Sequence, residues 1–257
     1  MKIFQYIEAK YLKLYFGEVD MNKEKVLGII GGMGPSATAD LFMKIIKHTN
    51  VKTEEEHLRI LIDNNPKLPN RQNAIMYGTE SPLPMLIEMA QGLERAGADF
   101  LILGANTPHY YFDDIVEAIN IPMLHIIDEA IKYIIKYKNN TKSIGIMATN
   151  AAIKTALFQK SIEKFGLVSV IPEQQFQEIL HNAIFQYKVD SDIVKFKEKA
   201  TEVLSHIKEK GVDAIILGCT ELPIVLQETE GTTPIIDPNE IIAKRVVEYA
   251  KENEKLN

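Results

Sequence analysis

The most restrictive feature of the sequence is an internal repeat. Segments 97–104 and 211–218 share five of eight residues, and the shared residues include both glycines and the aspartate. Chance reuse of an apolar pattern would not require the small and polar positions to match as well. We interpret the repeat as a duplication that gives two similar lobes. Two further landmarks recur at offsets of 117 and 112 residues: Gly28-Ile29 with Gly145-Ile146, and Ile121-Pro122 with Thr233-Pro234.

From Val26 onward, short apolar runs alternate with segments of helical length. Continuous apolar runs are typical of parallel strands buried on both faces, and the alternation is typical of parallel sheets covered by helices. The sequence therefore predicts an α/β fold of two pseudo-symmetric lobes, each a mostly parallel sheet flanked by helices. The predicted strands are 26–30, 58–62, 100–103, 123–127, 143–147, 168–171 and 214–217.

The domain organisation follows from the same pattern. Residues 1–22 precede it and are predicted to form an N-terminal extension, to which we assign no function. The first lobe is predicted to comprise 23–126 together with 227–257, and the second lobe 127–226. Ligands of open parallel sheets bind beyond the carboxyl ends of the strands. We therefore expect the active site in the cleft between the lobes, on the segments that follow the strands.

Composition and charge exclude several classes of function. The chain has 29 Lys and Arg against 35 Asp and Glu, a formal charge of −6, and no basic cluster free of acids, so we expect no nucleic-acid partner. No apolar run approaches the roughly 18 residues needed to cross a bilayer, so no membrane partner is expected. The single cysteine excludes an internal disulfide and favours a reducing, cytoplasmic location. No motif with metal-ligand spacing occurs, so no metal is expected.

That single cysteine, Cys219, stands just after a predicted strand and directly before Thr220 and Glu221. A thiol at a strand-to-helix turn can sense the helix N-terminus, which would lower its pKa and favour a thiolate that acts as nucleophile, general base or ligand. The alternative is a buried, inert cysteine. Thr220 can offer its hydroxyl and amide to a substrate carboxylate, or Thr220 and Glu221 can cap the next helix.

Three further segments carry candidate groups. The glycine turn 31–35, which contains Met33, fits neither G-x-G-x-x-G nor G-x-x-x-x-G-K-[ST], the glycine-rich patterns of nucleotide-binding loops. It can bring the backbone close to a small anion, or it can pack a strand tightly against a helix. Arg71 can clamp a carboxylate through its planar guanidinium, unless it is an isolated surface residue. Segment 106–109 follows the equivalent strand of the first lobe and is either a plain turn or a binding segment. His109 within it is more often a structural residue than a proton carrier.

Three spaced motifs together resemble the aspartate/glutamate racemase family: Gly28-Ile-Ile-Gly-Gly-Met-Gly-Pro-Ser-Ala-Thr38, Asn106-Thr107-x-His109 and Gly218-Cys-Thr-Glu-Leu-Pro223. The resemblance extends from about Val26 to Val247. It implies a two-lobed enzyme, often a homodimer, that needs neither pyridoxal phosphate nor any other cofactor. Such an enzyme holds an amino acid between its lobes, and two cysteines on opposite faces of Cα remove and return the proton.

The resemblance also implies roles for individual residues. Cys219 matches the catalytic cysteine of the second lobe. The positions that match contacts to the α-carboxylate and amino group are Asn106, Thr107, Thr149 and Thr220. The positions that match contacts to a side-chain carboxylate are Arg71 and Lys188. Met33 and Glu221 complete the predicted substrate-binding set.

The chain departs from this pattern at one position. The first-lobe cysteine should stand directly before Asn106, but Ala105 stands there, and the repeat pairs Ala105 with Cys219. Because alanine has no titratable proton, the symmetrical two-thiol mechanism is not available. Three alternatives are open. Water or a nearby group such as His109 supplies the missing proton, or the chain resembles one-cysteine enzymes of the arylmalonate-decarboxylase type, which protonate a carbanion from one face only. The third alternative is that the alanine was engineered.

From these observations we expect a cytoplasmic, cofactor-independent racemase whose partner is a small acidic amino acid, aspartate or glutamate, and which forms a homodimer. Cys219 is its remaining thiol acid/base, and Ala105 marks the position of the missing one. A one-cysteine decarboxylase or isomerase of small diacids is the alternative enzyme. A third interpretation is an amino-acid-binding protein that has lost catalysis with the first thiol.

Overall fold

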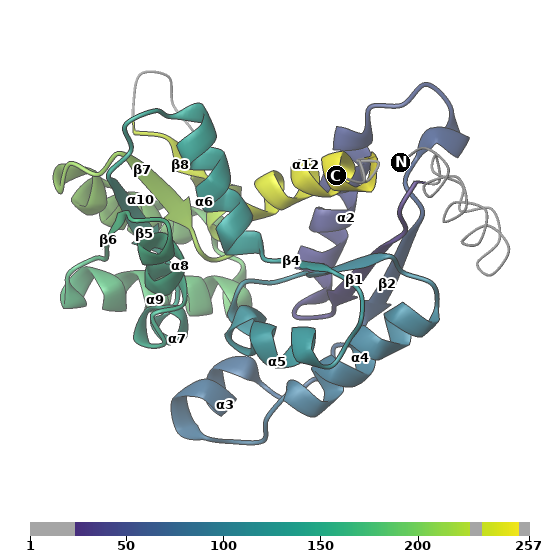
Figure 1. Cartoon of the computed structure of the whole chain (residues 1–257). Helices are drawn as coiled ribbons and strands as arrows, with labels where there is room; N and C mark the ends of the chain where they lie inside the picture. Colours follow the sequence, from purple (N-terminus) through teal and green to yellow (C-terminus); the bar gives the residue numbers. More distant parts are fainter. Residues whose placement is uncertain (1–23, 227–232, 252–257) are drawn as a thin grey trace, which may run out of the picture.

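The computed structural model describes residues 24–226 and 233–251. Within these ranges the chain forms two four-stranded sheets in which every paired strand runs parallel, with the orders β2-β1-β3-β4 and β6-β5-β7-β8. Figure 1 shows the two sheets in separate halves of the molecule, each surrounded by helices. The strands are β1 (Leu27–Gly31), β2 (Ile60–Asn64), β3 (Phe100–Leu103), β4 (Met123–Leu124), β5 (Ser143–Met147), β6 (Val168–Val170), β7 (Ala214–Leu217) and β8 (Ile235–Ile236).

The identical strand order of the two sheets confirms the predicted α/β fold with two similar lobes. In each sheet the first strand of the half lies between the second and the third, so β1 corresponds to β5 and β3 to β7. The repeated segments 97–104 and 211–218 contain β3 and β7, which occupy equivalent places. The repeat in the sequence is therefore a repeat of the topology.

Helices connect the strands and cover the sheets. In the first half they are α2 (Pro35–Thr49), the 3-10 helix η1 (Glu54–Glu56), α3 (Arg71–Tyr77), α4 (Leu83–Arg95), the 3-10 helix η2 (Thr107–Tyr111) and α5 (Phe112–Glu117). They continue with α6 (Ile126–Tyr137), α7 (Asn150–Lys154), α8 (Leu157–Lys164), α9 (Gln174–Asp190), α10 (Ile193–Glu209), α11 (Leu222–Val225) and α12 (Pro238–Lys251). Side-chain caps that accept a backbone N–H start α3, α6 and α10, and these caps are Asn70, His125 and Asp192.

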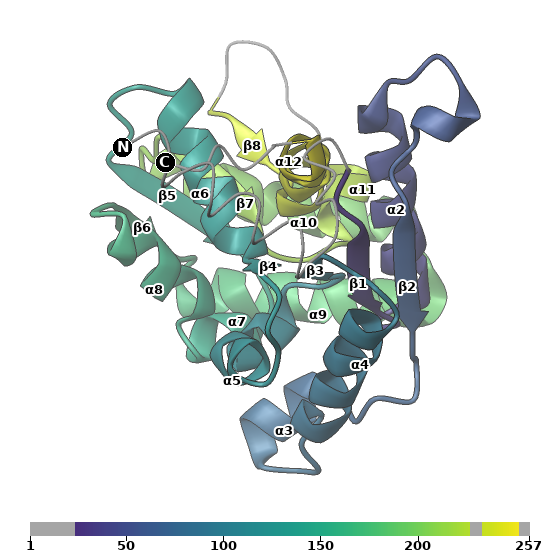
Figure 2. The ribbon, with the colours of Figure 1, turned by 45° about the vertical axis from the view of Figure 1, so that its right-hand side comes forward.

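One hydrophobic core joins the two sheets. Helices α6 and α12 bury apolar side chains in a cluster that also contains residues of both sheets, among them Ile29, Ile102, Ile144, Ile216, Ile131 and Val246. Helix α12 packs against both α2 and α6, and the two views place it between the sheets (Figures 1 and 2). The halves are thus held in a fixed relation by shared apolar packing.

Two boundaries differ from the sequence predictions. The strand predicted at 123–127 is the two-residue β4, because His125 caps α6 and the helix begins at Ile126. Strand β8 pairs with β7, so residues 235–236 belong to the second sheet and not to the first lobe, to which 227–257 was assigned. The extension predicted at 1–22 lies outside the described residues, and the rest of the predicted division stays a prediction.

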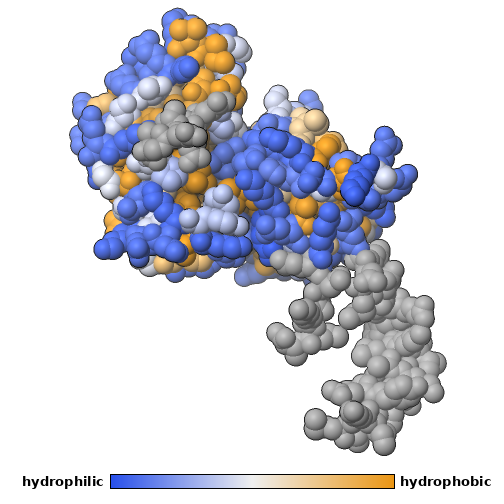
Figure 3. Space-filling model, turned by 90° about the horizontal axis from the view of Figure 1, so that it is seen from above, coloured by the Kyte–Doolittle hydropathy of each residue, from blue (hydrophilic) through white to orange (hydrophobic). Residues whose placement is uncertain are grey.

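None of the described helices is long and apolar enough to cross a membrane. The face of the molecule seen from above is mainly hydrophilic, with smaller hydrophobic areas between the polar residues (Figure 3).

The close approach of β5 to α10 gives a test of the fold. A Cβ on Gly145 would lie 2.5 Å from Ile207 Cγ2 and 3.2 Å from Val212 Cγ2. Ile207 is buried and stiff at χ1, so Gly145→Ala is expected to lower the free energy of unfolding by about 1–3 kcal/mol. Urea denaturation followed by circular dichroism measures this loss.

Gly92→Ala in α4 is the control, because a Cβ there meets only Arg95 Nη2 at 4.0 Å. This change is expected to leave stability unchanged or to raise it by up to about 1 kcal/mol, since alanine is the better helix former. Wild-type stability for Gly145→Ala would contradict the packing described for β5.

Candidate active site

A cavity of about 340 Å³ lies where segments following strands of both sheets meet α3 and α9. Residues from both halves of the chain line it. All of the residues predicted as catalytic or substrate-binding are among them: Met33, Arg71, Ala105, Asn106, Thr107, Thr149, Lys188, Cys219, Thr220 and Glu221. The structure therefore brings the predicted set together in one place, while their individual roles stay predictions.

Cys219 and Ala105 occupy equivalent positions in the two halves. Each is the second residue after its strand, β7 for Cys219 and β3 for Ala105. The glycine before each residue donates its backbone N–H to the neighbouring first strand, Gly104 to Ile30 O at 2.9 Å and Gly218 to Met147 O at 2.7 Å. The same backbone arrangement thus presents a thiol from the second half and a methyl group from the first half to one cavity.

The glycine before Cys219 is required by packing. A Cβ on Gly218 would lie 2.7 Å from Ala148 Cβ and 2.7 Å from Phe158 Cζ. Real Cβ atoms do not approach other carbon atoms so closely. Gly218 therefore fixes where the chain leaves β7 and where the Cys219 side chain begins.

The Cys219 thiol is buried and hydrogen-bonded to a carboxylate. Its Sγ donates a hydrogen bond to Glu221 Oε2 at 2.8 Å. Burial, and next the negative charge of Glu221, raise the pKa of the thiol to about 12, whereas Lys188 acts in the opposite direction. The prediction of a lowered thiol pKa is therefore wrong: α11 has only four residues, and desolvation outweighs its N-terminus.

Glu221 connects the thiol to a lysine. Its Oε2 also accepts a hydrogen bond from Thr220 Oγ1 at 3.3 Å, and its Oε1 lies 3.2 Å from Lys188 Nζ. Glu221 occupies the N-cap position of α11, but its side chain makes no capping hydrogen bond there. The side chains of Thr220 and Glu221 are thus directed to the polar groups of the cavity and not to the helix, which disfavours the capping alternative.

Arg71 contributes a second positive charge from the first half. It is the first residue of α3, whose start is fixed by Asn70 Oδ1 accepting from Asn73 N. Its Nη1 donates to Pro69 O at 3.4 Å, and no carboxylate of the described residues lies within ion-pair distance. Partial burial lowers the pKa of the guanidinium, which stays charged at neutral pH. Arg71 is therefore available to an anionic ligand.

Two buried polar atoms of the cavity lack partners among the described residues. They are Asn106 Oδ1 and Thr149 Oγ1. Buried polar atoms are nearly always hydrogen-bonded, so each exception needs an explanation. Because both residues line the cavity and follow strands of different sheets, a polar ligand that bonds to both sides would satisfy them.

The glycine turn shapes the edge of the cavity next to α2. Gly32 has a φ of +88° and donates its N–H to Thr38 Oγ1 at 2.9 Å. Thr38 Oγ1 in turn donates to Gly34 O at 3.1 Å. Met33 and Gly34 line the cavity. The turn is held by its own hydrogen bonds, and it brings backbone as well as the Met33 side chain to the site.

His109 is not part of the cavity lining. It is buried, and its Nδ1 lies 3.0 Å from Ala105 O and 3.1 Å from Asn106 O, while its Nε2 accepts from Ile126 N at 3.2 Å. These contacts assign the proton to Nδ1. Burial lowers the pKa of His109 well below its usual value. His109 therefore anchors the loop of Ala105 to α6, and the alternative that it supplies a proton is disfavoured.

The lining includes residues that the sequence patterns did not reveal, among them Asn70, Gln72 and Phe185. Phe185 lies three residues before Lys188 on α9, and residues at this spacing share a helix face. The predicted role of Lys188 could therefore have pointed to Phe185 as a neighbour in the site.

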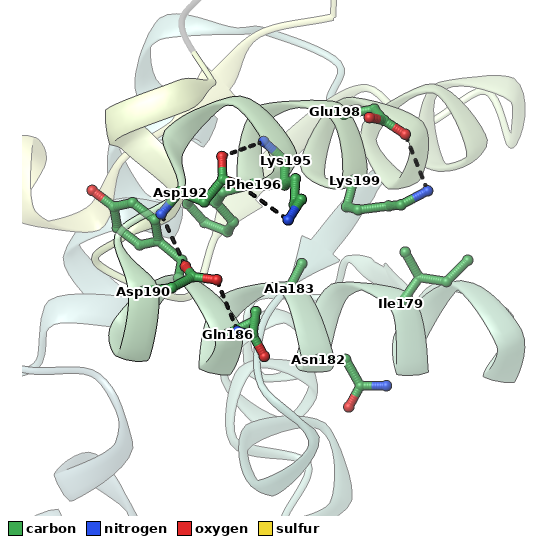
Figure 4. A pocket seen from close by; sticks show the side chains of 11 residues that line it. Ile179, Asn182, Ala183, Gln186, Asp190, Asp192, Lys195, Phe196, Glu198 and Lys199 are labelled. Atoms are coloured by element: carbon green, nitrogen blue, oxygen red, sulfur yellow. Dashed lines mark hydrogen bonds and ion pairs between the residues drawn. The ribbon is translucent and has the colours of Figure 1, made fainter.

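A separate cavity of about 400 Å³ between α9 and α10 contains none of the predicted residues (Figure 4). The described residues contain no cluster of three or more potential metal ligands.

Comparisons with known proteins agree with this geometry. The sequence model of the Asp/Glu/hydantoin racemase family matches residues 30–246. The broad specificity amino-acid racemase RacX of Bacillus subtilis is 28% identical over 234 residues, which are 86% of this chain and 96% of that protein. Both the family and this relative are named for racemases, and racemases are isomerases.

Two solved structures are similar along most of their length. The Picrophilus torridus aspartate racemase has a TM-score of 0.76 at 29% identity, over 90% of this chain and 96% of that chain. An aspartate racemase homologue from Pyrococcus horikoshii has a TM-score of 0.74 at 29% identity, over 89% of this chain and 100% of that chain. Since the match over residues 30–246 includes both strand ends that carry Ala105 and Cys219, the chain belongs to the Asp/Glu/hydantoin racemase family.

Proposed function

We propose that this protein is a cofactor-independent racemase that acts at Cα of an acidic amino acid, with Cys219 as its only thiol acid/base. The observation that carries the proposal is the position of Cys219 and Ala105, which follow equivalent strands and line the same cavity as two cationic side chains. The relatives named as amino-acid and aspartate racemases support the reaction type. The expected homodimer and cytoplasmic location stay predictions.

The substrate class follows from the charges and the unpaired polar atoms of the cavity. Arg71 has no carboxylate partner among the described residues and suits the side-chain carboxylate of aspartate or glutamate. Asn106 Oδ1 is an acceptor and suits the ammonium group, and Thr149 Oγ1 can donate to the α-carboxylate. Thr107 and Thr220 supply further hydroxyl groups at the same cavity.

Proton transfer is asymmetric in this proposal. The Cα–H of an amino acid is a very weak acid, so the carbanion-like state needs donors aimed at the α-carboxylate in a site with little water. Cys219 exchanges the proton on one face of Cα. On the other face, Ala105 offers no proton, and Arg71 is the one titratable side chain that the described first half contributes to the cavity. Water is therefore the proton source on that face, and inversion is slower than exchange at the Cys219 face.

The same asymmetry favours one alternative reaction. A site with a thiol on one face only suits an enzyme that protonates a carbanion from that face after loss of carbon dioxide from a small diacid. Release of carbon dioxide without Cα exchange in amino acids would favour this decarboxylase, and absence of both reactions would favour a binding protein.

The first test follows Cα–H by proton NMR in heavy water with L- and D-aspartate and L- and D-glutamate. Wild-type protein is expected to exchange Cα–H faster than it inverts the same enantiomer. Cys219→Ser is expected to slow exchange by about 10²–10⁴-fold, because a serine hydroxyl is a much poorer acid/base than a thiol. Wild-type exchange rates in the purified, folded variant would remove Cys219 from the mechanism.

Arg71→Ala tests the recognition of the side-chain carboxylate. Loss of a charge-assisted contact costs about 2–3 kcal/mol, so we expect aspartate and glutamate to bind ~30- to 150-fold more weakly, with little change for alanine. Isothermal calorimetry measures the affinities, and Arg95→Ala on exposed α4 surface is the matched control. An unchanged dissociation constant for both acids would exclude Arg71 as the clamp.

Ala105→Cys tests the missing proton donor. A thiol at this position would face the side of Cα opposite Cys219, and a positioned acid/base group contributes typically 10²–10⁴-fold. We expect faster racemisation and more nearly equal rates in the two directions, measured by polarimetry or chiral chromatography. Ala105→Ser, which is similar in size but much less acidic, is expected to give no such gain. A folded, substrate-binding Ala105→Cys variant without any gain would count against the two-sided geometry.

A further inference from the structure

We propose that the Lys188–Glu221 ion pair makes proton transfer at Cys219 conditional on an acidic substrate side chain, with Glu221 as the acceptor of the thiol proton. This inference rests on the proposed function. Lys188 acts through Glu221 and is thus a specificity-determining residue in addition to any contact it makes with substrate.

The geometry joins three side chains through one carboxylate. Glu221 Oε2 accepts the Cys219 Sγ–H at 2.8 Å, and Glu221 Oε1 lies 3.2 Å from Lys188 Nζ. The carboxylate is one-fifth exposed, whereas the Lys188 side chain is 40% exposed. Lys188 therefore holds the oxygen that does not face the thiol, and its positive charge repels a proton that approaches the same carboxylate.

An acidic substrate competes for the same ammonium group. Lys188 lines the proposed substrate cavity, so a side-chain carboxylate that enters beside Arg71 attracts it. A second cavity of about 680 Å³ also has Lys188, Thr220 and Glu221 in its lining. The Lys188 side chain thus borders two cavities and is 40% exposed. A small apolar substrate such as alanine offers nothing that would draw it away from Glu221.

The proton balance is complete without a further reactant. When Lys188 turns to the substrate carboxylate, the S–H bond of Cys219 breaks and an O–H bond forms on Glu221. The thiolate then takes the Cα proton, and water delivers a proton to the opposite face, leaving hydroxide. The proton held by Glu221 neutralises this hydroxide through solvent and restores the carboxylate, while Cys219 keeps the proton from Cα.

The experiment uses two variants of the full chain, Glu221→Gln and Lys188→Met. Their controls are Glu198→Gln and Lys195→Met, which alter a glutamate and a lysine of the separate α9–α10 cavity. These two residues also form ion pairs, Lys195 with Asp192 and Glu198 with Lys199 (Figure 4). One readout is the rate at which iodoacetamide alkylates Cys219, which is unambiguous because it is the single cysteine of the chain. The other readout is Cα–H exchange in heavy water for aspartate, glutamate and alanine.

For Glu221→Gln the two readouts are expected to move in opposite directions. Removal of the carboxylate that raises the thiol pKa should speed alkylation in mildly alkaline buffer by about tenfold or more, since one pKa unit changes the thiolate fraction tenfold. Exchange of aspartate or glutamate should nevertheless fall by about 10²-fold or more, because the proton acceptor is gone. A loss of both alkylation and exchange would indicate a structural role only and would overturn the proposal.

For Lys188→Met the readout that decides is Cα–H exchange. Exchange of the preferred acid should fall through a higher KM, whereas exchange of alanine should rise severalfold, because Glu221 is then permanently released. If Lys188→Met lowers the Cα–H exchange rate equally for alanine and for the acids, the role of Lys188 is overturned. If Glu221→Gln exchanges Cα–H at the wild-type rate, the role of Glu221 is overturned. If the wild-type protein exchanges the Cα–H of none of these amino acids, the proposed function itself is overturned. The alkylation rates alone would not reveal this failure.

Discussion

Parallel strand pairing is the constraint on which the site depends. Because all strands of a sheet run in one direction, the segments that follow them leave at one edge. Two such edges supply the cavity, Ala105 from the first and Cys219 from the second. The shared core of α6 and α12 keeps the sheets in this relation. The relation between the two edges that supply the cavity is therefore set by apolar packing.

Burial and charge give the cavity an uneven chemistry. The thiol is desolvated and donates to a carboxylate, and both features raise its pKa. The two cations differ as well, since Lys188 already has a carboxylate partner and Arg71 has none among the described residues. A ligand carboxylate thus meets one free positive charge and one that it must share.

The sequence predicted the two parallel-sheet lobes from the repeat and from the alternation of strands and helices. It also predicted many of the residues that line the cavity, several of them only through the family resemblance. The glycines and aspartate of the repeat located β3 and β7, and through them Ala105 and Cys219. The pKa of Cys219 could not be derived in the same way, since it depends on burial and on Lys188, which comes from another helix. Strand β8 was missed because it has only two residues and takes its place from pairing with β7.

The path of the last helix has a consequence for how the chain folds. After β8 of the second sheet, α12 returns to the first half, where Lys25 N donates to Ala250 O and where Lys44 and His48 of α2 pair with Asp237 and Glu240. The first half therefore cannot complete its core until α12 (Pro238–Lys251) has been synthesised. Contacts of such large sequence separation form late and slow folding. We expect the two halves to unfold in one cooperative transition, even though each has a sheet of its own.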